Sequence, residues 1–154
     1  MLTINKKVFK ALQKANIQYC HWKSNEHLLQ GLQGKTDLDI LIAKNTADKA
    51  KTILQKSGFH YFSGPQSMEY KGLQHWIGMD EQTKKLSHIH LHDYLRIGEK
   101  HLKGYILPWE QLILNTATND PTTNITIADP NLELILLLTR SALKIRCRDY
   151  LLAL

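Results

Sequence analysis

Residues 34–42 read GKTDLDILI, and this stretch decides the fold more than any other part of the chain. After a short turn of small and polar residues, aspartate and aliphatic side chains alternate with the period of two that is typical of a β-strand. The aliphatic side chains share one face, which we expect to pack inward. Asp37 and Asp39 leave the opposite face together. The pattern therefore predicts a strand over residues 37–43 that carries two neighbouring carboxylates.

Helical and strand-like patterns alternate on both sides of this strand. Helices are predicted over residues 4–15, 24–34, 46–58 and 108–116, and from Asp129-Pro130 onward. Further strands are predicted over residues 17–22, 59–62, 74–79, 86–95 and 125–127. This order is typical of an α/β (α+β) domain in which helices flank a mixed β-sheet.

The chain divides into two expected parts. Residues 1–95 form the core, and residues 96–154 form a C-terminal helical extension that packs on it. The sequence ends on the apolar residues 151–154 without a helix cap. We therefore expect contact with a further C-terminal region or with a second copy of the chain.

Composition limits the partners. The 154 residues include 20 Lys and Arg but 14 Asp and Glu, which gives a net charge of +6 and favours anionic partners such as nucleotides. The sequence carries no recognisable signature of DNA or RNA binding, so nucleic acid is the least expected of these partners. It also shows no signal peptide and no apolar run of the ~20 residues that a bilayer requires, so no membrane contact is expected. Two cysteines, Cys20 and Cys147, are too few for a disulfide framework and favour a cytoplasmic protein with reduced thiols.

The two carboxylates point to a metal ion. Asp37 and Asp39 repel each other unless a cation lies between them. Mg²⁺ prefers oxygen ligands and often combines one or two carboxylates with the phosphates of a substrate. The alternative is a solvated strand edge whose polar face happens to hold two aspartates.

A second segment strengthens the metal interpretation. Residues 19–24 read YCHWKS and precede the acidic strand by one short helix. Together with DLDI at residues 37–40, they resemble the nucleotidyltransferase superfamily, the fold of polymerase beta and of aminoglycoside nucleotidyltransferases. That family places a glycine followed by glycine or serine before a helix, and then an acidic, hydrophobic, acidic, hydrophobic strand. Ser24 stands at the glycine or serine position, whereas Lys23 departs from the usual glycine. The resemblance covers about residues 1–95 and is strongest to bacterial branches of the superfamily.

The resemblance implies a function and a site. It implies metal-dependent transfer of a nucleoside monophosphate from a nucleoside triphosphate to a hydroxyl acceptor. Asp37 and Asp39 would hold Mg²⁺ or Mn²⁺. Ser24 and the backbone amides that follow it would bind the phosphates with help from Lys23, and Ser24 would also cap the short helix. The alternative is a nucleotide- or metal-binding module of a larger protein that performs no transfer.

A histidine-rich segment completes the expected site. Residues 86–93 read LSHIHLHD, so that His88, His90 and His92 share one strand face. The family carries a third carboxylate between hydrophobic neighbours on such a strand, and here that position is His90. We expect His90 to lie beside both aspartates, as a general base or as a ligand of a softer metal such as Zn²⁺ or Mn²⁺. Three histidines on one strand also resemble a small zinc site, but neighbours on one face lie about 7 Å apart along the backbone, so one ion rarely takes all three. The alternative is a polar strand face with partly exposed imidazoles.

Overall fold

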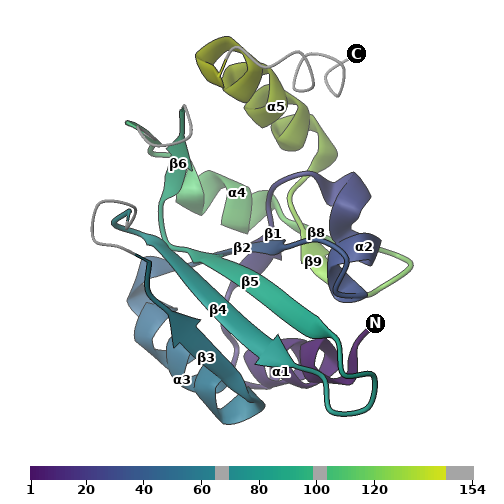
Figure 1. The fold of residues 1–154 in the computed structure, drawn as a ribbon. Coiled ribbons are helices and arrows are strands. Elements are labelled where there is room, and N and C mark those ends of the chain that lie inside the picture. Colours follow the sequence, from purple (N-terminus) through teal and green to yellow (C-terminus); the bar gives the residue numbers. More distant parts are fainter. Residues whose placement is uncertain (65–69, 99–103, 145–154) are drawn as a thin grey trace.

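The computed structural model describes residues 1–64, 70–98 and 104–144. These residues form five α-helices, a seven-stranded mixed sheet and a separate two-stranded sheet (Figure 1). The predicted α/β (α+β) class is therefore confirmed. Cys147 and the apolar residues 151–154 lie outside the described residues.

The seven-stranded sheet has the strand order β3-β4-β5-β2-β1-β9-β8. Its strands are β1 (Tyr19–His21), β2 (Leu38–Ile42), β3 (Phe59–Phe62), β4 (Leu73–Met79), β5 (Leu86–His92), β8 (Thr118–Asn119) and β9 (Thr126–Ile127). The smaller sheet pairs β6 (Leu95–Ile97) with β7 (Tyr105–Leu107). The helices are α1 (Thr3–Lys14), α2 (Leu28–Leu32), α3 (Ala47–Ser57), α4 (Glu110–Thr116) and α5 (Pro130–Lys144), with 3₁₀ turns at Asn25–His27 and Lys44–Thr46.

The strand β2 lies near the middle of the large sheet. It runs antiparallel to β1 and parallel to β5, while β5 runs antiparallel to β4. In this register Asp39 stands beside His90, and His90 stands opposite His75. Side chains paired in this way point to the same face of the sheet.

One face of the sheet carries the main core and is covered by helices over β2 and β5. The aliphatic residues of β2 that were predicted to point inward are buried there against α1, α2 and α3, whose contributions include Val8, Leu32 and Leu54. Figure 1 shows α1 and α3 on the same side of β3, β4 and β5. The apolar face of β2 and the apolar face of α1 thus belong to the same core.

The opposite face is covered at one end only. Cys20 and Leu41 pack there against Ile113 of α4, Leu136 of α5 and Leu95 of β6. Beyond Leu41 this second core stops, and the same face continues with the polar side chains of β2, β4 and β5. This face of the sheet therefore has a partly exposed polar area next to a buried apolar cluster.

Several elements differ from the sequence prediction. The strand expected over residues 86–95 is two strands, because the chain leaves β5 after His92 and the amide of Asp93 donates to the carbonyl of Gly72 at 3.1 Å. Gly72 has a φ of +82°, which a residue with a side chain rarely adopts. Helix α4 begins at Glu110 rather than at Pro108. Residues after 95 also contribute strands to the large sheet, since β9 pairs with β1 and β8.

The last described element is α5, and its exposed apolar side chains include Leu134, Ile135 and Leu138. None of the helices in the described ranges combines the length and the apolar composition needed to cross a bilayer. Cys20 is a free thiol, and burial raises its pKa to about 12.

Candidate metal centre

The polar area of the sheet brings Asp37, Asp39 and His90 together. The Nδ1 atom of His90 lies 3.2 Å from Oδ1 of Asp39, and its Nε2 atom lies 3.6 Å from Oδ2 of Asp37. This proximity follows from the register, because β2 and β5 are parallel neighbours with Asp39 and His90 side by side. The position of His90 beside both carboxylates is as the sequence predicted, whereas its chemical role stays a prediction.

Asp39 is the most densely contacted carboxylate of this group. Its Oδ1 atom accepts hydrogen bonds from Lys23 Nζ at 3.1 Å, from His90 Nδ1 at 3.2 Å and from His92 Nε2 at 3.0 Å. Burial raises the pKa of Asp39, but the charge of Lys23 and the bonds from the two imidazoles outweigh it, so that this pKa lies well below its ordinary value. Asp39 is therefore an anion at neutral pH.

His92 positions Asp39 from the buried side. It is 3% exposed, and burial lowers its pKa to about 4 against the opposing effect of Asp39. His92 is thus neutral near pH 7, and its Nε2–H must be the proton that it donates to Asp39. Its Nδ1 then carries a lone pair, and that atom is buried with no hydrogen-bond partner among the described residues. The ring stands edge-on to Trp22, with 5.1 Å between the centroids.

Asp37 lies at the rim of the same area, just before β2 begins. Its Oδ1 atom lies 2.8 Å from Nδ1 of His88, and its side chain is 49% exposed. The hydrogen bond from His88 lowers the pKa of Asp37, burial opposes this, and His90 lowers it further. A cation that reaches Asp37 from solvent therefore meets an ionised carboxylate.

One member of the cluster was missed by the sequence prediction. His75 of β4 faces His88 and His90 across the antiparallel pair, with its Nδ1 atom 3.2 Å from Nε2 of His88. The sequence signal was a histidine within a predicted strand next to the histidine-rich strand. Its partner became identifiable only with the register of β4 against β5.

The structure corrects the expected capping role of Ser24. Ser24 precedes the 3₁₀ turn at Asn25–His27 but has a left-handed backbone, with φ of +59°, and its side chain makes no capping hydrogen bond. The backbone amide of Asn25 instead donates to Oε1 of Glu133 in α5 at 2.6 Å. A carboxylate thus takes the amide that a phosphate was expected to approach, and Glu133 could be found only from the packing of α5. Burial raises the pKa of Glu133, and its bond to Asn25 opposes this.

Lys23 lies inside the cluster, as its candidate role requires. Besides its contact with Asp39, its ammonium group lies 5.4 Å from the ring centre of Trp22. Its side chain is 23% exposed. The lysine is therefore a cation that an incoming anion can reach and that already neutralises part of the charge on Asp39.

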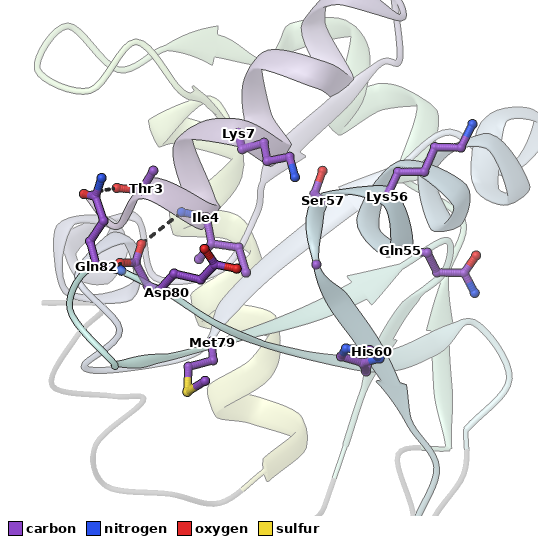
Figure 2. A pocket seen from close by; sticks show the side chains of 12 residues that line it. Thr3, Ile4, Lys7, Gln55, Lys56, Ser57, His60, Met79, Asp80 and Gln82 are labelled. Carbon is purple, nitrogen blue, oxygen red and sulfur yellow. Dashed lines mark hydrogen bonds between the residues drawn. The ribbon is translucent and has the colours of Figure 1, made fainter.

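A separate hollow lies away from the cluster, between α1, the end of α3, β3 and the turn after β4 (Figure 2). Its lining includes Lys7, Lys56 and His60, and none of its lining residues belongs to the Asp and His cluster. The buried carboxylate in its wall, Asp80, accepts a hydrogen bond from the backbone amide of Ile4 at 3.0 Å. Asp80 therefore satisfies a backbone amide in the first turn of α1, which gives this carboxylate a structural role.

The cluster offers two sets of three ligand atoms within the described ranges. One set comes from Asp39, His90 and His92, and the other from His75, His88 and His90, with the atoms of each set within 4.8 Å of one another. Carboxylate oxygens suit Mg²⁺ and Mn²⁺, whereas imidazole nitrogens suit Zn²⁺ and its neighbours in the transition series.

Comparison of the chain with protein families, with curated proteins and with solved structures finds no significant match. The resemblance to nucleotidyltransferases therefore stays a prediction, and the function has to be argued from the site itself.

Proposed function

We propose that this domain binds Mg²⁺ or Mn²⁺ between Asp37 and Asp39 and transfers a nucleoside monophosphate from a nucleoside triphosphate to a hydroxyl acceptor in the cytoplasm. The observation that carries the proposal is the convergence of Asp37, Asp39 and His90 from two parallel neighbouring strands. A hard divalent ion prefers carboxylate oxygens, and here it can reach an ionised pair from solvent through the half-exposed Asp37.

The side chains of the site support distinct tasks. A bound divalent ion would supply charge neutralisation to the triphosphate and help to align it for in-line attack. Asp37 and Asp39 would hold that ion, and neutral His92 would keep Asp39 aimed at it through their 3.0 Å hydrogen bond. His92 is therefore a positioning residue.

His90 and Lys23 lie where the reacting groups would approach. His90 would complete the ligand set or accept the proton of the attacking hydroxyl, since an imidazole nitrogen can serve either as a metal ligand or as a general base. Lys23 would exchange its contact with Asp39 for a phosphate oxygen once the metal takes over that carboxylate. Its amine is a mobile point charge, which suits this exchange.

A second candidate function is nucleotide or metal binding without transfer. Two observations favour it: an imidazole occupies the place of the third carboxylate, and Glu133 occupies the backbone amide of Asn25. A carboxylate so close to the expected phosphate path weakens triphosphate binding by charge repulsion.

Nucleotide binding with a matched pair of variants tests the proposal. Calorimetry with ATP, CTP, GTP and UTP should detect binding only when Mn²⁺ is present. Asp37→Asn should weaken this binding at least about 100-fold, because the ion loses a charged ligand. Asp48→Asn is the control, since Asp48 is an exposed aspartate of α3 whose contact is Lys51. Equal affinity in Asp37→Asn and in the unmodified chain would refute the site.

Pyrophosphate release separates the two candidate functions. The same four nucleotides with Mn²⁺ and a panel of hydroxyl acceptors should yield pyrophosphate from the unmodified chain and none from Asp37→Asn. Metal-dependent binding without pyrophosphate release from any combination would favour the binding module instead.

A further inference from the structure

The geometry points to a second metal site on the same sheet face, a three-imidazole centre of His75, His88 and His90 that takes Zn²⁺ or a similar borderline divalent ion. This inference does not rest on nucleotidyl transfer. It uses His75, which takes no part in the proposed reaction, and it treats Asp37 and Asp39 as outer carboxylates rather than as ligands.

The antiparallel pairing of β4 and β5 creates the cluster. Along β5 alone, His88 and His90 supply two imidazoles on one face, so a third imidazole has to come from a neighbouring strand. His75 stands directly opposite His90 and diagonally from His88, so it fills the space between them. The three rings accordingly lie 4.4 to 5.3 Å apart between centroids.

The nitrogen positions fit a tetrahedral ion. A Zn–N bond of about 2.0–2.1 Å gives a tetrahedron whose edge is about 3.4 Å. The Nδ1 atom of His75 and the Nε2 atom of His88 are 3.2 Å apart, which is one such edge. One ligand atom of His90 lies within 4.8 Å of both, so small rotations of the rings bring all three to one ion.

The carboxylates already orient two of the three imidazoles. His88 directs Nδ1 to Asp37 at 2.8 Å and thereby turns Nε2 toward His75. His90 directs Nδ1 to Asp39 at 3.2 Å, which leaves its Nε2 for an ion. A metal-binding histidine commonly donates its other ring N–H to a carboxylate in this way, and the carboxylate fixes the tautomer. The cluster thus has both the inner ligands and the outer partners of a histidine metal site.

The site is also accessible and open on one side. All three histidines are partly exposed, so an ion can enter from solvent. Three protein ligands would leave one position of a four-coordinate ion for water. Oδ2 of Asp37 lies 3.6 Å from Nε2 of His90 and is therefore a nearby hydrogen-bond acceptor. The two proposed sites share His90, so a Zn²⁺ ion held by the three imidazoles withdraws that ligand from the carboxylate site.

Zinc affinity of the untagged chain tests the inference. Competition with a chromophoric chelator should show that His75→Ala weakens Zn²⁺ binding at least about 100-fold, whereas its Mn²⁺ affinity stays that of the unmodified chain. His60→Ala is the control, because His60 is an exposed histidine of the adjacent strand β3 outside the cluster. Asp37→Asn should weaken Zn²⁺ binding by about 10- to 100-fold, the range for an outer carboxylate.

Two results would overturn the site. One is a Zn²⁺ affinity of His75→Ala equal to that of the unmodified chain. The other is a zinc X-ray absorption spectrum of the unmodified chain that shows fewer than three imidazole ligands; this measurement decides even if His75→Ala fails to fold. Absence of Mn²⁺-dependent nucleotide binding by the unmodified chain would refute the proposed function and leave these zinc results unchanged, so the two failures are distinguishable.

Discussion

Asp39, which is partly exposed, and Asp80, which is buried, both have a pKa below its ordinary value, yet different kinds of group hold them. Asp80 accepts hydrogen bonds from the backbone amides of Ile4, Gln82 and Thr83. The bond from Ile4 is the largest cause of its lowered pKa. Asp39 instead accepts bonds from three side chains, every one of them able to titrate. Backbone amides are fixed once the chain has folded, whereas side chains can exchange partners.

The two aspartates also differ in what their bonds connect. Asp80 joins the start of α1 to the turn after β4, two segments 76 residues apart. The partners of Asp39 sit on or next to β1 and β5, which already pair with β2 through their backbones. The bonds of Asp80 therefore link segments that lie far apart in the chain, whereas those of Asp39 add to strand pairings that are already made by the backbone. A largely buried anion that is held by titratable side chains rather than by backbone amides is a marker of a functional site.

The largest effect that separates the two regions is on metal binding. Asp39→Asn should weaken Mn²⁺ binding at least about 1,000-fold, equivalent to about 4 kcal/mol, because a charged ligand is lost from a buried position. Asp80→Asn should leave Mn²⁺ affinity unchanged. Titration of Mn²⁺ followed by electron paramagnetic resonance measures both. A similar loss in the two variants would remove the distinction drawn between them.

The second effect concerns the free energy of unfolding, which should depend on pH because His92, a partner of Asp39, has a lowered pKa. The pKa of His92 is lowered to about 4 in the folded chain, whereas the unfolded chain takes up this proton near 6.5. Below pH 6.5 the unfolded state therefore binds more protons, and the free energy of unfolding falls until the pH reaches about 4. The difference amounts to about 3 kcal/mol at 1.36 kcal/mol for each pKa unit.

Urea denaturation at pH 7 and pH 4 measures this contribution. His92→Gln keeps an N–H donor for Asp39 but cannot titrate, so its loss of stability between the two pH values should be smaller by that amount. An equal loss in His92→Gln and in the unmodified chain would show that His92 is not held neutral by burial. His60→Gln serves as the control, because His60 is exposed.

The sequence could predict features that depend on the periodicity of a single strand or helix, but not those that depend on contacts between distant segments. The alternation around Asp39 and in residues 86–92 fixed which side chains share a face, because the period of a strand is a local property. It also placed His90 near both carboxylates once β2 and β5 were taken as neighbours. The two strands are indeed parallel neighbours.

The features that the sequence did not predict depend on contacts between distant segments. His75 joins the cluster through the register of β4 against β5, and Glu133 of α5 meets the amide of Asn25 although the two residues are 108 positions apart in the chain. The left-handed backbone of Ser24 was equally hidden, since serine carries no strong signal for that conformation. Patterns along one element could not reveal any of these three.

A third prediction concerns stability in the Asp80 region. Asp80→Ala should lower the melting temperature by about 5 °C, because the start of α1 and the following turn lose the acceptor of their amides. Metal affinity should stay unchanged. Calorimetric unfolding measures the effect, and Asp48→Ala at an exposed aspartate of α3 is the control. An unaltered melting temperature in Asp80→Ala would contradict the structural role assigned to this carboxylate.

The smallest expected effect is that of Lys23→Met. This variant tests whether Asp39 can exchange its lysine partner for a metal ion. Lys23 competes with a metal ion for Asp39, and its ion pair is partly exposed, so it is worth about 1 kcal/mol or less. Lys23→Met should therefore raise Mn²⁺ affinity about two- to five-fold in the absence of nucleotide. Once the triphosphate is present, the same variant should lose affinity for it, because a phosphate contact is gone.

These opposite signs distinguish an exchangeable partner from a structural one. Lys51→Met is the matched control, because Lys51 also pairs with an aspartate but on the exposed side of α3. It should change neither affinity. If Lys23 served only to neutralise Asp39 within the fold, its loss would raise metal affinity without any loss of nucleotide affinity. If it served neither purpose, both affinities would stay as they are. Only an exchange of Asp39 for a phosphate gives a gain in one affinity and a loss in the other.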